Sequence, residues 1–145
     1  LPAYEVSNHA KDEDRSTHNM IYWQGGSWVG IGPGAHGRLW INGQRIATET
    51  YLAPEGWLKQ VSENGSGTRK REVLGSSDIA NEYVMMGLRM RDGIKKDTYR
   101  DTVGADLNIP AWLIEDTLVQ ENKDRIWIPQ SGRLLLNRIV QELMI

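Results

Sequence analysis

Three histidines and the aromatic residues beside one of them are the side chains of this chain best suited to chemistry. His18 opens a dense segment, His18-Asn19-Met20-Ile21-Tyr22-Trp23. Imidazole is a common protein ligand of heme iron, and a flat macrocycle needs apolar or aromatic walls with a polar rim. If the segment is helical, His18 and Tyr22 share one face because they are four residues apart. The segment therefore places an imidazole and two aromatic rings close together, an arrangement compatible with an iron ligand in an aromatic-walled site.

Two neighbours of His18 have supporting roles in this interpretation. Asn19 is expected to orient the imidazole by accepting its second N–H, and Trp23 offers a surface on which a ring can stack. The alternative is structural. His18 and Asn19 would then only cap a helical turn, while Tyr22 and Trp23 would pack into the protein.

The second motif is rich in glycine and reads Gly30-Ile31-Gly32-Pro33-Gly34-Ala35-His36-Gly37. Glycines let a backbone approach a ligand closely and adopt positive φ. No Lys-Ser/Thr pair follows and the spacing is not G-x-G-x-x-G, so phosphate binding is not predicted. His36 is a candidate second iron ligand or polar site residue. Alternatively, the stretch is a strand and tight turn that only shapes the fold.

The remaining chemistry is excluded by residue type and spacing. His9, His18 and His36 lack the i, i+4 spacing of a helical zinc site, and we assign His9 no role. The chain has no cysteine, which excludes disulfides and thiolate metal sites. No nucleophile–base constellation is apparent, and the G-x-S-x-G elbow is absent.

Composition bounds the class of protein. A net charge of -2 and a pI near 5.9 disfavour a nucleic-acid surface, which needs a basic excess. There is no run of 18 apolar residues and no signal-peptide pattern, so a cytoplasmic location is expected. The first residue is Leu1 and not Met, which fits either a piece of a longer protein or processing of the N-terminus.

The first half of the chain predicts short strands and one hairpin. Strands are expected over residues 3–10 and 27–32, with a surface loop at 11–17 and a helical turn over 19–24. Asn42-Gly43 between β-forming residues predicts a hairpin, because a type I′ turn needs φ > 0 at both central positions.

The second half predicts mostly helices. Pro54 is tolerated in the first turn of a helix over 54–61, and a Gly/Ser-rich linker follows at 62–70. Ile79, Tyr83, Met86 and Met90 form an apolar stripe on a helix that begins at Ser77 or Asp78 and reaches Arg91. The other predicted elements are a helix over 96–103 closed by Gly104, a helix over 110–122, a β strip over 125–128 and a helix over 132–144.

These motifs resemble those of a known family. Tyr4-Glu5-Val6-Ser7-Asn8, the His18 segment and the glycine-rich stretch are similar to the oxygen-independent coproporphyrinogen III oxidase-like proteins of the radical SAM superfamily. An H-N-x-x-Y-W motif is a hallmark of their heme-chaperone (HemW-type) branch. Two further segments resemble helices of the family, Tyr83-Val84-Met85-Met86-Gly87-Leu88-Arg89-Met90 and Gly132-Arg133-Leu134-Leu135-Leu136-Asn137.

The resemblance implies an α+β fold. Residues 1–61 would form the end portion of a radical SAM α/β barrel with its β-hairpin, residues 62–70 a linker, and residues 71–145 a helical, winged-helix-like domain of the HemN C-terminal type. The resemblance also places Gly32, Gly34 and Ala35 near S-adenosylmethionine as backbone contacts. Such proteins bind a 4Fe–4S cluster through C-x-x-x-C-x-x-C, which this chain lacks. The cluster and S-adenosylmethionine are therefore expected only in a full-length parent, and the chain alone is expected to be inert.

The leading functional hypothesis is the C-terminal fragment of a heme-chaperone-like protein. It would bind heme or porphyrin through His18, Asn19, Tyr22 and Trp23 and pass it to an acceptor protein. Alternatively, the parent is an oxygen-independent coproporphyrinogen III oxidase, which decarboxylates two propionates in porphyrin biosynthesis. A third interpretation makes the helical part a winged-helix nucleic-acid binder, which the charge and the absence of Lys or Arg from residues 110–122 disfavour.

Overall fold

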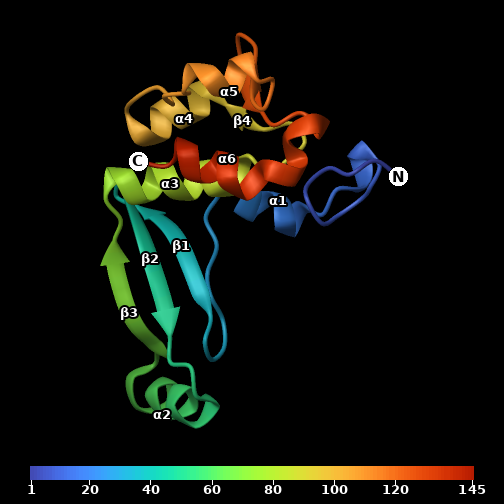
Figure 1. The fold of residues 1–145 in the computed structure, drawn as a ribbon. Coiled ribbons are helices and arrows are strands. Elements are labelled where there is room, and N and C mark those ends of the chain that lie inside the picture. Colours follow the sequence, from blue (N-terminus) through green and yellow to red (C-terminus); the bar gives the residue numbers. More distant parts are fainter. The chain divides into compact units, whose positions relative to one another are not determined.

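The structure is a computed structural model that describes residues 1–145, and its chain divides into two compact units. Unit 1 contains residues 1–25 and 76–145, and unit 2 contains residues 26–75. Figure 1 labels most of their helices and strands, and each unit is described by itself. Helices and strands both contribute, so the fold is mixed helix and sheet, as the sequence predicts.

The first ten residues of unit 1 form a loop that folds back on itself and not the predicted strand. Tyr4 N–H donates to the Asn8 carbonyl at 3.1 Å, and Ala3 and His9 form an isolated bridge. The buried Glu5 carboxylate accepts hydrogen bonds from the Ser7 backbone N–H and the Asn8 amide. The residues Tyr4-Glu5-Val6-Ser7-Asn8 therefore stabilise one another locally, and their pairing with the rest of unit 1 is limited to an isolated bridge between Glu5 and Met90.

Two short helices follow in the N-terminal part. A 3-10 turn, η1 (Asp12–Asp14), lies within the predicted loop, and α1 (Thr17–Trp23) confirms the predicted helical turn. Ser16 caps α1, since its hydroxyl accepts the Asn19 N–H at 3.3 Å. Gly25 ends the helical run with φ +68°.

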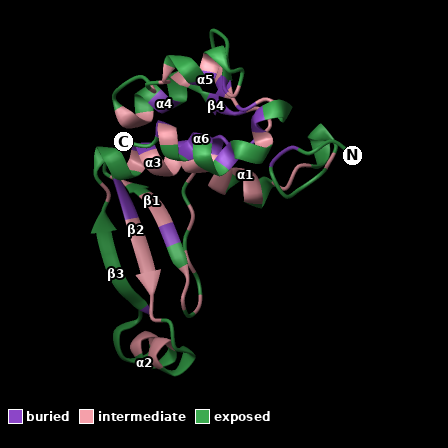
Figure 2. Cartoon of the chain, in the orientation of Figure 1, coloured by how far each residue is buried: buried purple, intermediate pink, exposed green.

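The core of unit 1 is built on α3 (Ser76–Gly87), and the predicted apolar stripe on this helix is wrong by about one residue. Ala80, Val84 and Gly87 are its buried residues, whereas Ile79, Tyr83 and Met86 of the predicted stripe are half-buried. Met90, the last residue of that stripe, is buried but lies beyond the end of the helix. The helix also ends before Arg91, at Gly87. Figure 2 shows buried residues concentrated in the helices and strands of this unit. The buried cluster contains Ala80, Val84, Leu88, Ile94, Tyr99, Leu113, Val119, Ile126, Ile128, Leu136, Ile139, Val140 and Leu143.

The remaining elements of unit 1 surround this core. A small antiparallel sheet has the order β4-β6-β5. Helix α4 ends at Gly104, whose φ is +85°, as the sequence predicts. The elements are β4 (Ile94–Lys95), α4 (Lys96–Val103), α5 (Ala111–Glu115), β5 (Gln120–Glu121), β6 (Arg125–Trp127), η2 (Gln130–Leu135) and α6 (Leu136–Leu143).

Two predicted helices in this region differ from the structure. Helix α5 stops at Glu115 because Thr117 adopts a left-handed φ of +54°. The Leu118 and Val119 N–H groups then both donate to the Leu113 carbonyl, which turns the chain toward β5. The last predicted helix divides into η2 and α6, and its buried side includes Leu136 while Leu135 is exposed.

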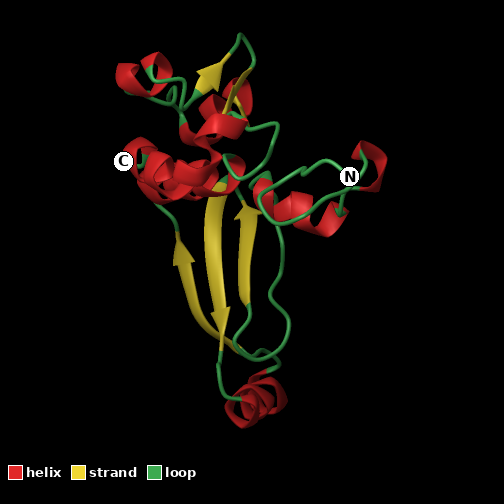
Figure 3. Ribbon diagram, turned by 45° about the vertical axis from the view of Figure 1, so that its right-hand side comes forward, coloured by secondary structure: helices red, strands yellow, loops and turns green.

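Unit 2 is a three-stranded antiparallel sheet with one helix, as Figure 3 shows. Its elements are β1 (His36–Ile41), β2 (Gln44–Thr50), α2 (Pro54–Asn64) and β3 (Thr68–Val73), with the strand order β1-β2-β3. Asn42 and Gly43 have φ values of 52° and 76°, so the predicted hairpin is confirmed. Pro54 occupies the first turn of α2, also as predicted.

Two predictions in unit 2 are wrong. Residues 27–32 are not a buried strand, because Val29 and Ile31 are 63% and 84% exposed and only Trp28 forms a bridge, with Arg38. Residues 62–70 are not an irregular linker, since their ends belong to α2 and β3 and only 65–67 form a turn. The compact units meet at 25/26 and 75/76 and not at 62–70.

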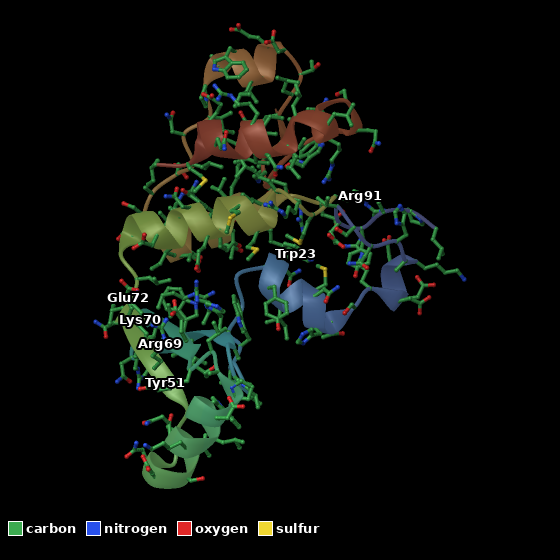
Figure 4. All side chains as sticks on the ribbon, turned by 60° about the horizontal axis from the view of Figure 1, so that its bottom comes forward. Trp23, Tyr51, Arg69, Lys70, Glu72 and Arg91 are labelled. Atoms are coloured by element: carbon green, nitrogen blue, oxygen red, sulfur yellow. The ribbon has the colours of Figure 1, made fainter.

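Strand β3 is exposed along its whole length. Its charged side chains form local ion pairs, Arg69 with Glu49 and Lys70 with Glu72, each at 2.6 Å. Figure 4 labels Arg69, Lys70 and Glu72 on this strand. The basic residues Arg69, Lys70 and Arg71 therefore lie on a solvent-exposed strand.

Candidate functional site

Helix α1 brings His18 and Tyr22 together. They lie one helical turn apart, and the Tyr22 hydroxyl hydrogen-bonds to His18 Nε2 at 3.0 Å. The two rings meet edge to face, with centroids 4.8 Å apart and an interplanar angle of 87°. His18 is exposed and Tyr22 is half-buried. The predicted shared face is confirmed, and the imidazole is held in one orientation by a phenol.

Asn19 and Trp23 both belong to α1, as predicted, but their contacts differ from the predicted ones. The hydrogen-bond partner of the His18 ring is Tyr22 and not Asn19, whose backbone N–H bonds to the capping Ser16 hydroxyl. Trp23 closes α1 and is labelled in Figure 4. Its indole Nε1 is buried without a hydrogen-bond partner. Tyr22 therefore takes the orienting role assigned to Asn19.

The glycine-rich stretch lies in unit 2 and is bonded to the end of β2. Gly34 N–H donates to the Tyr51 carbonyl at 2.8 Å, and Ala35 N–H donates to the Thr50 hydroxyl at 2.8 Å. The same hydroxyl donates to the Gly32 carbonyl at 2.6 Å. Gly32 and Gly34 have φ values of 93° and 69°, which glycine alone adopts at low cost. The backbone N–H groups of Gly34 and Ala35 are thus satisfied within the protein.

The other two histidines belong to segments outside α1. His36 is an exposed residue at the start of β1 in unit 2, opposite Glu49. His9 lies in unit 1 and lines a groove of about 540 Å³. The groove also contains Glu5, Arg91, Arg133 and several apolar residues, namely Pro2, Ala3, Val6, Leu134 and Leu136.

A second pocket in unit 1 was not predicted from the sequence. It has a volume of about 250 Å³ and is formed by α1 and the residues around β4. Its lining comprises Arg15, Met20, Gln24, Tyr83, Met90, Asp92, Gly93, Ile94, Lys95, Thr98 and Arg125. These residues are far apart in the chain, so no local motif signals them.

An ion-pair network stands beside this pocket. Arg15 bonds to Asp92 at 2.6 Å and to Asp12 at 2.7 Å, and Arg91 bonds to Asp12 at 2.8 Å. Burial raises the pKa of Asp92, but the hydrogen bonds from Arg15 and Arg91 outweigh it and hold that pKa below its usual value. The hydrogen bonds to Asp92 and Asp12 raise the pKa of Arg15. Both groups are therefore charged near neutral pH.

Two classes of site have no counterpart in the structure. No group of three or more His, Asp or Glu side chains is arranged to hold a metal ion. The chain also has no cysteine to bind an iron–sulfur cluster.

None of the helices has the length and apolar character needed to cross a membrane.

The comparisons with known proteins agree on one family. Residues 75–135 match the family model of the HemN C-terminal domain, and they coincide with much of the second segment of unit 1. The chain is 46% identical over 95 residues to Radical S-adenosyl methionine domain-containing protein 1, mitochondrial, of Danio rerio, an alignment that covers 63% of this chain and 21% of that protein. It is 28% identical over 141 residues to Heme chaperone HemW of Bacillus subtilis, which covers 94% of this chain and 36% of that protein.

A solved structure extends the comparison to the fold. The structure described as "Coproporphyrinogen III oxidase (HemN) from Escherichia coli is a Radical SAM enzyme" superposes with a TM-score of 0.57 at 20% identity. The superposition covers 80% of this chain and 28% of that one. The chain spans 21% and 36% of the two curated relatives named above. The resemblance first indicated by the motifs is confirmed: residues 75–135 match the HemN C-terminal domain, and the relatives found are heme chaperones of the HemW type and radical S-adenosyl methionine domain-containing proteins.

Proposed function

We propose that this chain is the C-terminal part of a heme-chaperone-like radical SAM protein and that it binds heme through His18. The observation that carries the proposal is the exposed imidazole of His18, which the Tyr22 hydroxyl orients on the surface of α1. The similarity to Heme chaperone HemW of Bacillus subtilis over nearly the whole chain supports the same function.

The residues of α1 suit one side of a heme site. An exposed imidazole can approach iron without breaking the core, and the Tyr22 ring stands edge-on beside it. Trp23 is half-buried at the end of the same helix and has a buried indole N–H without a partner. We assign His18 to the iron and Asn19, Tyr22 and Trp23 to contacts with the macrocycle, with the Tyr22 hydroxyl orienting the His18 ring only in the heme-free state. His36, in unit 2, is the candidate for a second iron ligand.

The radical chemistry of the family would need residues outside this chain. A 4Fe–4S cluster is bound by cysteine thiolates, and none is present here. Gly34 and Ala35 do not fit as N–H donors to S-adenosylmethionine because Tyr51 and Thr50 already accept from them. If this stretch contacts S-adenosylmethionine, the contact would therefore be made by the backbone of Gly32, which has open space beside it because a Cβ there would meet no atom within 4 Å. The cluster and S-adenosylmethionine are assigned to the full-length parent only.

The architecture of the parent follows the same proposal. We assign residues 76–145 of unit 1 to a winged-helix-like domain and the radical SAM barrel to the full-length parent, with residues 26–75 as a compact unit of their own. The small sheet β4-β6-β5, whose strand β4 contacts α4, supports a winged-helix-like arrangement together with the packing of α3 against α4 and α6. We propose a cytoplasmic location, with a mitochondrial one as the alternative because the Danio rerio relative carries that word in its name.

An oxygen-independent coproporphyrinogen III oxidase is the second candidate for the parent. The Escherichia coli structure supports it at the level of the fold. A nucleic-acid-binding role is disfavoured because α5 contains no Lys or Arg with which to contact phosphates.

One experiment separates the chaperone from the oxidase. The full-length parent, with its cluster reconstituted, is incubated anaerobically with S-adenosylmethionine, a reductant and coproporphyrinogen III, and is separately titrated with heme. The proposal expects a saturable heme complex and no decarboxylated product. Turnover of coproporphyrinogen III without a heme complex would establish the oxidase and overturn the proposal.

A further inference from the structure

The pocket between α1 and β4 is a site separate from the His18 motif. Met20 lines it from α1, and Gln24, the residue that follows the helix, lines it four positions further along the chain. His18 precedes Met20 by two positions, which at about 100° per residue places it roughly 200° around the helix. The pocket therefore opens on the face of α1 opposite to the proposed heme ligand.

The charges that line the pocket are predominantly positive. Arg15, Lys95 and Arg125 contribute cations, and Asp92 is the single carboxylate among the lining residues. Asp92 is already engaged, because Arg15 bonds to its side chain at 2.6 Å and Arg125 Nη1 donates to its carbonyl at 3.0 Å. Arg15 is therefore paired with carboxylates, whereas Lys95 and Arg125 line the pocket without a carboxylate partner.

Two of these cations retain donors for a ligand. The Arg15 side chain is 17% exposed, and its Nε is buried without a hydrogen-bond partner although both terminal nitrogens are bonded. Leaving a buried charged donor unbonded is costly, so an oxygen atom of a ligand at this point would be stabilising. The Lys95 ammonium takes part in no ion pair of the structure.

The neutral walls of the pocket suit a small molecule with an apolar part. Met20, Met90 and Ile94 supply apolar surface. Tyr83 is bonded to Thr98, and burial raises the pKa of its phenol, so the hydroxyl is neutral at physiological pH. A volume of about 250 Å³ admits a small metabolite and excludes a macrocycle.

We propose that this pocket binds a small molecule that bears an oxyanion, a carboxylate or a phosphate, through Arg15, Lys95 and Arg125. The oxyanion lies against these three cations, and the apolar part of the ligand contacts Met20 and Ile94. Carboxylate and phosphate share this chemistry, because both present several acceptor oxygens to guanidinium and ammonium donors. The site does not depend on heme binding by His18.

The test is a titration of the 145-residue chain followed by ¹H–¹⁵N NMR. Three probes are used separately: inorganic phosphate, hexanoate, and sodium chloride at matched ionic strength. Saturable shifts are expected at the Lys95 and Thr98 amides and at the Gln24 side-chain amide, with either phosphate or hexanoate and not with chloride. The stronger of the two probes identifies the source of the oxyanion.

Matched variants assign the binding to the pocket. Arg125→Gln is expected to lower the affinity for the stronger probe about ten-fold, and Lys95→Gln about three-fold. The effects differ because a charge-assisted hydrogen bond from the half-buried Arg125 is worth more than one from the exposed Lys95. Lys123→Gln is the control, because Lys123 is an exposed lysine outside the pocket. Arg125 also donates a hydrogen bond to the Asp92 carbonyl, so Arg125→Gln could destabilise the fold. Lys95→Gln keeps the test valid in that case, because Lys95 makes no ion pair in the structure. Shifts that follow ionic strength alone, or equal affinities for Lys95→Gln and Lys123→Gln, would overturn the proposal.

Discussion

The Tyr22 hydroxyl and the Nε2 atom of His18 are 3.0 Å apart on the exposed surface of α1, with their rings edge to face. This contact occupies the ring nitrogen that projects furthest from the backbone. Heme iron that binds at Nε2 must therefore displace the phenol. His18 Nε2 therefore has two mutually exclusive partners, the Tyr22 hydroxyl in the heme-free state and iron in the proposed heme complex.

Tyr22→Phe is predicted to tighten heme binding. The substitution removes the competing hydrogen bond, which at an exposed site is worth about 0.5–1.5 kcal/mol, so the Kd should fall roughly two- to ten-fold. Equilibrium titration of the Soret band measures this change. Tyr51→Phe in unit 2 is the matched control and should leave the Kd unchanged. A weaker complex for Tyr22→Phe would instead assign the iron to Nδ1, with Tyr22 accepting from Nε2–H.

The chain alone is predicted to be catalytically inert. Cleavage of S-adenosylmethionine by this family starts from a reduced 4Fe–4S cluster, and the chain has no cysteine with which to bind one. Chromatographic assay for 5′-deoxyadenosine under reducing, anaerobic conditions should find none. Its accumulation above a protein-free control would refute this prediction.

Gly93→Ala is predicted to destabilise unit 1 far more than Gly104→Ala does. Both glycines have left-handed φ values, 64° and 85°. A Cβ at Gly93 would lie 2.0 Å from the Ile126 carbonyl oxygen, whereas one at Gly104 meets nothing within 4 Å. Urea unfolding should show a loss of about 1 kcal/mol for Gly104→Ala, from backbone strain alone. The loss for Gly93→Ala should be roughly 3 kcal/mol or more, because β6 must move. Equal losses would contradict the tight approach of Gly93 to β6.

Asp92→Asn is predicted to reduce the acid sensitivity of the fold. The pKa of Asp92 is lowered in the folded state, so its contribution is present above its ordinary value of 3.8 and is lost as the pH falls through the folded pKa. The group is 38% exposed, which limits the contribution to about 1 kcal/mol or less. The variant should be slightly less stable at pH 7, with a flatter decline between about pH 4 and pH 2.

Thermal unfolding as a function of pH measures this difference. Asp116→Asn, at the exposed end of α5, is the control. If the two variants decline in parallel with wild type below pH 4, the Arg15–Asp92 pair does not stabilise the fold.

Features that depend on neighbouring residues were predictable from the sequence. Asn42-Gly43 specifies its own turn, Gly104 ends α4, and His18 and Tyr22 share a face because a helix repeats every 3.6 residues. Each depends on fewer than six consecutive residues.

Features that depend on distant residues were not predictable. The apolar residues Val29 and Ile31 predict a buried strand over 27–32, but in the structure both side chains are exposed. Residue type alone does not determine which part of the protein would pack over them. The oxyanion pocket is assembled from residues 15, 92, 95 and 125, which only tertiary packing brings together. Tyr22 was predicted as a heme contact, and its hydrogen bond to His18 became visible only with side chains in place.

The most direct test of the central claim is a heme titration of the full-length parent and its His18→Ala variant. His36→Ala and His9→Ala serve as controls, since His36 lies in unit 2 and His9 lines a separate groove. If His18 ligates the iron, wild type should show a shifted Soret band that the His18→Ala variant loses, with an affinity at least about ten-fold lower. His9→Ala should behave as wild type, and His36→Ala should alter the spectrum only if His36 is the second ligand. Equal affinity and an unchanged Soret band in the His18→Ala variant would contradict the account and leave the motif as packing.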